Sequence, residues 1–232
     1  MRFQDAAPDA RAIVYAGIQA EPLVARLAAL LAGASYEERL LARAVMNGES
    51  TDPAAWRTMF PSLFDDTAGA AGPATAETIL AASLAVADRG EQARSQYRGA
   101  VVESLAALLL ARALGPAVPP NAVRRERRVL FDGVRAEIHP YDVTVEVPGR
   151  TLAVDCKWGA RGISADVLHQ LDDARSHAAD EDEILGVVLV VFDSERSCRV
   201  RLERQTGPYE RTAIVGLESL DTLAAAGRPA GR

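Results

Sequence analysis

Two aspartates and one lysine are the residues best placed to do chemistry, because their spacing brings them together on a predicted β-hairpin. Asp142 lies on the first strand of this hairpin, and Asp155 and Lys157 lie on the second. Like charges that face each other across a sheet destabilise it. A divalent cation resolves that conflict, since hard cations prefer carboxylate oxygens as ligands. A surface cluster in which Lys157 pairs with Asp155 is the alternative interpretation.

The hairpin is predicted from its turn and from the alternation of its side chains. Pro148-Gly149 is typical of a tight turn, because proline presets φ at the first central position and glycine accepts a positive φ at the second. A two-residue turn sets the pairing so that Asp142 lies opposite Asp155, with Cβ atoms roughly 5 Å apart. Alternation then predicts one apolar face and one face that carries the charges.

A third acid, Glu103, lies inside an apolar helix predicted over residues 94–114. It is the one charged residue between positions 99 and 111. A buried acid costs several kcal/mol unless it is paired, protonated or bound to a cation. Glu103 is therefore expected either to form a structural ion pair, with Arg98 as a possible partner, or to belong to a functional site.

The densest basic patch of the chain lies on the segment 124–131, which is predicted to be the first strand. Its members are Arg124, Arg125, Arg127 and Arg128. Two interpretations remain open: an edge strand protected by charge, or a surface that contacts nucleic-acid phosphates. A turn signal, Asp132-Gly133, follows the patch.

The region after the hairpin is predicted to alternate between helix and strand. Ser164 is a good N-cap for a helix over 165–178, which carries Gln170. The continuous apolar run 184–192 is rich in β-branched residues and predicts a strand buried on both faces. Two weaker strands are expected, at 198–203 and 212–217. A short helix is expected over 218–225, and a disordered tail is expected over 223–232.

Residues 1–95 are predicted to be helical and to carry no recognisable chemistry. Ser35 followed by Glu38 is a capping box, and Thr75 is expected to cap a later helix. The small residues 69–73 are the best candidate for an internal linker. This region is expected to serve packing or dimerisation, or to read DNA.

Composition limits the class of protein. The chain has 232 residues, a net charge of −6 and two cysteines. It has no run of eighteen apolar residues and no layout typical of a signal peptide, which predicts a cytoplasmic protein without a membrane span. The acidic charge argues against a general nucleic-acid coat protein, but a nuclease can bind through a local basic patch.

The order of these elements and acids resembles the PD-(D/E)xK nuclease superfamily, which has the restriction-endonuclease-like fold. The resemblance covers residues 98–192 and rests on the combination of Glu103 on a helix, Asp142 on one strand, Asp155 and Lys157 on the next, and a buried strand after the following helix. The acid before the lysine is Asp where Glu is commoner, and Tyr141 separates Pro140 from Asp142.

The resemblance implies an α/β fold with an αβββαβ core, a mixed central sheet flanked by helices, and an N-terminal α-helical extension. It implies that Mg²⁺, which Mn²⁺ can replace, is held by Glu103, Asp142, Asp155 and the backbone carbonyl of Cys156. Lys157 would orient or activate the attacking water or stabilise the phosphate, and Gln170 matches, more loosely, a helical glutamine found in some branches.

The implied function is metal-dependent DNA endonuclease activity of the restriction or phage-defence type. A repair or recombination nuclease, such as a junction resolvase or a RecB-like exonuclease, and a catalytically silent DNA-binding or assembly subunit are the alternatives. The expected partners are DNA and either a second copy of the chain or a larger defence or repair complex. The expected division is a helical region over 1–95, a nuclease-like domain over 96–222 and a tail over 223–232.

Overall fold

The computed structural model describes residues 1–7, 10–65, 72–116, 119, 121–135, 139–180, 184–205 and 212–226. The chain forms two compact units. A sheet unit contains residues 1–8 and 106–232, and a helical unit contains residues 9–105. The division therefore falls inside the long predicted helix, and residues 1–8 belong to the sheet unit.

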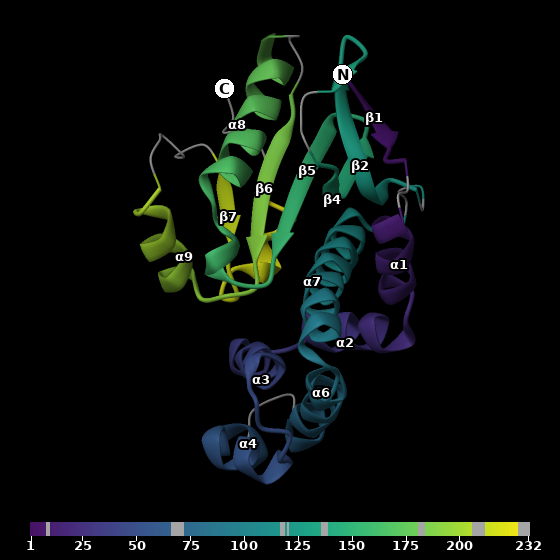
Figure 1. Ribbon diagram of the computed structural model, residues 1–232. Helices are drawn as coiled ribbons and strands as arrows, with labels where there is room; N and C mark the ends of the chain where they lie inside the picture. Colours follow the sequence, from purple (N-terminus) through teal and green to yellow (C-terminus); the bar gives the residue numbers. More distant parts are fainter. Residues whose placement is uncertain are drawn as a thin grey trace. The chain divides into compact units, whose positions relative to one another are not determined.

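The sheet unit is built around a seven-stranded mixed sheet with the order β1-β2-β4-β5-β6-β7, in which β3 also pairs with β2 (Figure 1). The pairs from β1 to β5 are antiparallel, whereas β5-β6 and β6-β7 are parallel. The strands are β1 (Arg2–Asp5), β2 (Val123–Phe131), β3 (Val134–Arg135), β4 (Tyr141–Val147), β5 (Arg150–Lys157), β6 (Gly186–Val191) and β7 (Ala213–Val215). The predicted class, α/β with a mixed sheet flanked by helices, is confirmed.

The hairpin β4-β5 has the predicted turn and register. The ladder runs from Val147↔Arg150 to Val143↔Val154. Gly149 has the expected positive φ of 74°. The hairpin is not half-exposed, however: Ala153, on the face predicted to carry the charges, is fully buried. Ala153 lies in the same core cluster as Leu168 and Leu171 of the helix that follows the hairpin, so this face of β5 is covered where the sequence suggested it was open.

The helix α8 (Ala165–Asp180) follows the short 3₁₀ helix η1 (Ala160–Gly162) and packs on the sheet beside β6 (Figure 1). Leu168 and Leu171 point into the core beneath it, where Val187 and Leu189 of β6 are also buried. Every residue of β6 is buried, which confirms the strand predicted to be covered on both faces.

Two elements of the sheet unit differ from the prediction. Residues 2–5, expected to be helical, form the strand β1, which pairs with β2. Residues 198–203, expected to be a strand, lie in or next to the helix α9 (Glu195–Leu202). Its N-cap is Ser194, whose side chain accepts a hydrogen bond from the Ser197 amide at 3.2 Å. The cap makes helix the stable local choice.

The end of the sheet unit also departs from expectation. The segment predicted as a short helix contains a single 3₁₀ turn, η2 (Leu220–Thr222). Leu223 is fully buried, and the Ala224 carbonyl accepts a hydrogen bond from Arg150. The predicted disordered tail over 223–232 is therefore wrong at its start, and residues 227–232 lie outside the described part of the chain.

The helical unit contains the helices α1 (Ala10–Gln19), α2 (Pro22–Ala32), α3 (Tyr36–Asn47), α4 (Pro53–Met59), α5 (Pro61–Phe64), α6 (Gly72–Ala87) and the first part of α7 (Glu91–Leu114). The capping box of Ser35 and Glu38 at the start of α3 is confirmed. Thr75 lies inside α6 and does not cap it. The predicted linker falls mostly on residues outside the described ranges.

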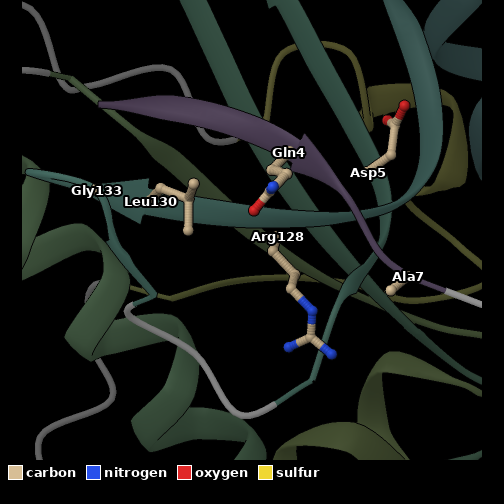
Figure 2. A pocket seen from close by; sticks show the side chains of 6 residues that line it. All are labelled: Gln4, Asp5, Ala7, Arg128, Leu130 and Gly133. Atoms are coloured by element: carbon tan, nitrogen blue, oxygen red, sulfur yellow. The ribbon is translucent and has the colours of Figure 1, made fainter.

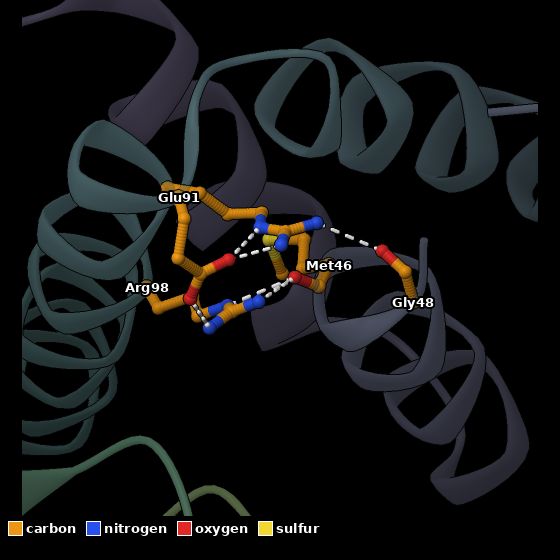
Figure 3. A network of polar contacts seen from close by, with 5 residues as sticks. Met46, Gly48, Glu91 and Arg98 are labelled. Atoms are coloured by element: carbon orange, nitrogen blue, oxygen red, sulfur yellow. Dashed lines mark hydrogen bonds and ion pairs between the residues drawn. The ribbon is translucent and has the colours of Figure 1, made fainter. Parts of the chain in front are cut away.

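The carboxyl end of α3 is held by arginines from α7 (Figure 3). Arg94 donates a hydrogen bond to the Gly48 carbonyl at 2.8 Å, and Arg98 donates to the Met46 carbonyl at 2.8 Å. Glu91 accepts from both guanidinium groups and fixes their orientation. Cations at a helix carboxyl end satisfy carbonyls that lack partners within the helix and oppose the negative end of its dipole.

No single helix of the described chain is long and apolar enough to cross a membrane. Taken together, α1 and α2 have the length and apolar composition of a membrane span, but the two helices meet at a bend of 57°.

Candidate functional site

Three of the predicted site residues come together on β4 and β5. The Lys157 Nζ lies 2.7 Å from the Asp155 Oδ2. Asp142 lies one residue beyond the last printed pair of the β4-β5 ladder, Val143↔Val154, and its Oδ2 accepts a hydrogen bond from the Cys156 amide at 2.6 Å. This bond joins Asp142 to the residue that follows Asp155, and the predicted pairing of the two aspartates lies just outside the ladder.

The two carboxylates and the ammonium group influence one another electrostatically. Burial alone would lower the pKa of Lys157, but the nearby charges of Asp155 and Asp142 outweigh it and raise that pKa above its ordinary value. Lys157 is therefore protonated at neutral pH. The lysine also holds two like-charged carboxylates together in a place where they would otherwise repel each other.

Lys157 is packed tightly on one side. A Cβ atom added to Gly162 of η1 would lie 2.9 Å from Cβ, Cγ and Cδ of Lys157. Only glycine leaves room for this stem, so η1 fixes the direction in which the lysine extends. The sequence contained the glycine four residues after Trp158, but nothing in it indicated this contact.

The donor set suits one metal ion in part. Asp142 and Asp155 supply carboxylates and Cys156 supplies a backbone carbonyl, and Mg²⁺ commonly binds through one or two carboxylates with water in the remaining positions. Among the residues that the structure describes, no group of three or more His, Cys, Asp or Glu side chains could hold a metal. These residues would therefore suit a cation that takes two carboxylates, those of Asp142 and Asp155, and completes its coordination with water.

The third predicted acid, Glu103, belongs to the helical unit and has partners there. Its Oε1 accepts a hydrogen bond from the Tyr15 hydroxyl at 2.5 Å, and its Oε2 accepts from the Gln19 side chain at 2.6 Å. The suggested ion pair with Arg98 is wrong, since Arg98 bonds to Glu91 and to the Met46 carbonyl. Both donors to Glu103 are neutral and lie more than eighty residues away in the sequence.

Removing one of these donors is expected to destabilise the helical unit. In Tyr15→Phe the buried Glu103 carboxylate loses a hydrogen bond, which lowers the free energy of unfolding by about 1–3 kcal/mol. Urea denaturation followed by circular dichroism measures the change. In a Glu103→Gln background the same substitution should cost less, and strictly additive costs would show that this hydrogen bond does not stabilise the fold.

Gln170 is placed away from the role that the resemblance implied. The Gln170 side-chain amide donates a hydrogen bond to the His139 backbone carbonyl at 3.2 Å. The Gln170 backbone carbonyl accepts a hydrogen bond from the Tyr141 hydroxyl at 3.3 Å. These bonds connect α8 to the segment before β4. Gln170 thereby helps to position the strand that carries Asp142.

The arginines of β2 are not on an edge strand, because β1 and β4 flank β2 on both sides. Arg124 pairs with Asp5 at 2.7 Å. Arg127 is 8% exposed and pairs with Asp5 at 3.0 Å and Glu146 at 3.3 Å. These two side chains neutralise acids of the sheet, which leaves them poorly placed for phosphate contacts.

Arg125 and Arg128 differ from that pair. Both are half-buried. Arg128 lines a hollow of about 420 Å³ between β1 and the β2-β3 turn (Figure 2). The other residues of this hollow are Gln4, Asp5, Ala7, Leu130 and Gly133.

A second hollow contains residues that the sequence interpretation missed. It lies between η1 and α9 and is lined by Arg161, Arg196, Arg201 and Arg204. Residues 198–203 were interpreted as a strand, so no shared surface was expected for Arg196, Arg201 and Arg204. The signal that could have found them is the four-residue spacing of Arg196, Val200 and Arg204 after the N-cap Ser194.

Comparison with known proteins adds little to this geometry. No protein-family model matches the sequence, and no curated protein matches it. Among solved structures, the chain is similar to protein VC1899 from Vibrio cholerae, with 17% sequence identity and a TM-score of 0.49. The similarity covers 90% of this chain and 58% of the other, so the chain spans little more than half the length of that protein.

Proposed function

We propose that the chain is a divalent-metal-dependent DNA endonuclease that hydrolyses phosphodiester bonds, of the restriction or phage-defence type. The observation that carries the proposal is the convergence of Asp142, Asp155 and Lys157 on adjacent strands. The order α7, β2, β4, β5, α8, β6 supports it as well, because it is the order expected of a restriction-endonuclease-like core.

Phosphodiester hydrolysis needs a nucleophilic water and a means to stabilise the charge that grows on the phosphate and the leaving oxygen. Asp142, Asp155 and the Cys156 carbonyl would hold a Mg²⁺ or Mn²⁺ ion, which would lower the pKa of a bound water and place a positive charge beside the phosphate. Lys157 places a second positive charge there. A charged Lys157 would stabilise the phosphate and orient the attacking water.

The direction of the lysine side chain should matter as much as its charge. Gly162→Ala forces Lys157 to move, and a misplacement of about 1 Å can cost up to about a hundredfold in rate. We expect cleavage to fall at least tenfold and the free energy of unfolding to fall by about 1–3 kcal/mol. Gly33→Ala, where no atom lies within 4 Å of the added carbon, is the matched control. Equal cleavage by both variants would contradict the role given to η1.

A catalytically silent DNA-binding or assembly module is the second candidate. The observation that favours it is the satisfied state of the site: Asp155 already has Lys157 as a partner at 2.7 Å, and the described residues contain no group of three metal-binding side chains. Such a module would bind DNA and leave it uncut.

The deciding experiment is cleavage of supercoiled plasmid and of single-stranded and branched DNA, with Mg²⁺, Mn²⁺ or EDTA. Wild type is compared with Lys157→Met, which keeps most of the side-chain stem and removes the charge. Metal-dependent cutting that the variant lacks would establish the nuclease, and preference for branched DNA would move it to the repair or recombination class. Binding without cutting of any substrate would favour the silent module.

A further inference from the structure

We propose that the groove between η1 and α9 binds the sugar-phosphate backbone of a nucleic-acid strand without reading its sequence. The groove has a volume of about 380 Å³. Four arginines line it, Arg161 from η1 and Arg196, Arg201 and Arg204 from α9 and its carboxyl end. Guanidinium groups match phosphate oxygens in geometry as well as in charge.

The helix α9 is anchored so that its arginines face outward. Cys198 is 3% exposed and lies in the core of the sheet unit, where Leu202 also packs. Arg196, Val200 and Arg204 follow one another at four-residue intervals and so share the opposite face. Arg201 is fixed by a hydrogen bond from its Nε to the Ile163 carbonyl at 2.9 Å. The groove is therefore built before any ligand arrives.

None of the four groove arginines forms an ion pair with a residue that the structure describes, whereas Arg57, Arg98 and Arg127 each pair with at least one carboxylate. Four arginines around one groove, in a chain of net charge −6, make a local concentration of positive charge that suits a polyanion.

The position of the groove connects it with Lys157. Arg161 is the neighbour of Gly162, the residue against which the Lys157 stem packs. A nucleic-acid strand that lies along the arginines would therefore pass beside Lys157 and its partner Asp155. The lining offers arginines, Ser197 and the aliphatic Val200. Contacts that arginines make to phosphates hold the backbone and carry no sequence information.

The inference rests on the proposed function only for the identity of the ligand, and it is tested without cleavage. Fluorescence anisotropy in EDTA measures binding of the full chain to a duplex of about 20 base pairs and to a single strand of the same length. Arg196→Gln/Arg204→Gln is compared with Arg26→Gln/Arg199→Gln, which removes the same charge from exposed positions outside the groove. Circular dichroism checks that both variants fold.

We expect the groove variant to lose about tenfold or more in affinity at 0.1 M salt. The slope of log K against log salt should become about 1.8 smaller in magnitude for the duplex and about 1.4 smaller for the single strand, as expected for the loss of two phosphate contacts. The two arms also show which form of nucleic acid the groove prefers.

Equal losses in both variants would overturn the inference, because binding would then depend on net charge alone. Failure of the wild type to bind either ligand would overturn it as well. Binding that is lost in the groove variant, in a protein that cuts no DNA, would support the groove and reject the nuclease. Normal binding and cutting by the groove variant would reject the groove and leave the nuclease intact.

Discussion

Asp155→Asn is expected to reduce metal-dependent DNA cleavage by at least about a hundredfold, in line with the loss of one group that stabilises transition-state charge. The substitution removes a negative charge from the site and keeps an oxygen that can accept the hydrogen bond of Lys157. Initial rates of plasmid nicking at saturating Mg²⁺ measure the effect.

The same variant should fold normally. Relief of the repulsion between Asp155 and Asp142 partly compensates for the weakened ion pair, so the free energy of unfolding should change by no more than about 1–2 kcal/mol. Asp166→Asn, an exposed acid of α8, is the control and should cut DNA like the wild type. Undiminished cleavage by Asp155→Asn would remove Asp155 from the site.

Val190→Asp should unfold the sheet unit. Val190 is 1% exposed and lies on β6, which has strands on both sides and buried residues throughout. An unpaired charge there costs about 3–5 kcal/mol, a large part of the roughly 5–15 kcal/mol that stabilises a typical domain. Thermal unfolding followed by circular dichroism measures the loss.

Val134→Asp makes the same chemical change on β3, where the side chain is 69% exposed. A substitution at such a position should alter the free energy of unfolding by no more than about 0.5 kcal/mol. A stable Val190→Asp protein would mean that β6 is not an interior strand buried on both faces.

Local patterns were enough to predict the hairpin and the central strand. The turn at Pro148-Gly149 and the period of two residues determine which side chains share a face, so the β4-β5 register followed directly. The apolar run that contains β6 is rich in β-branched residues, which favours a strand buried on both faces. Asp142, Asp155 and Lys157 came together for the same reason, because their positions depend on a single turn.

The errors arose where the pattern was ambiguous or the partner was distant. Residues 198–203 alternate like a strand, but the same letters fit one face of a helix, and short segments fit either period. The suggested ion pair of Glu103 with Arg98 was wrong for a different reason. Its donors, Tyr15 and Gln19, lie on another helix, and no local rule could bring them to it.

β1 could not be predicted from four residues alone, and its pairing has a consequence for how the chain is made. Arg127 of β2 donates to the Phe3 carbonyl, across 124 residues of sequence. At about 5–20 residues per second, the ribosome needs roughly 6–25 s to add that length. The whole helical unit, residues 9–105, is synthesised in this interval. β1 therefore waits, unpaired with β2, while the helical unit is synthesised between the two strands.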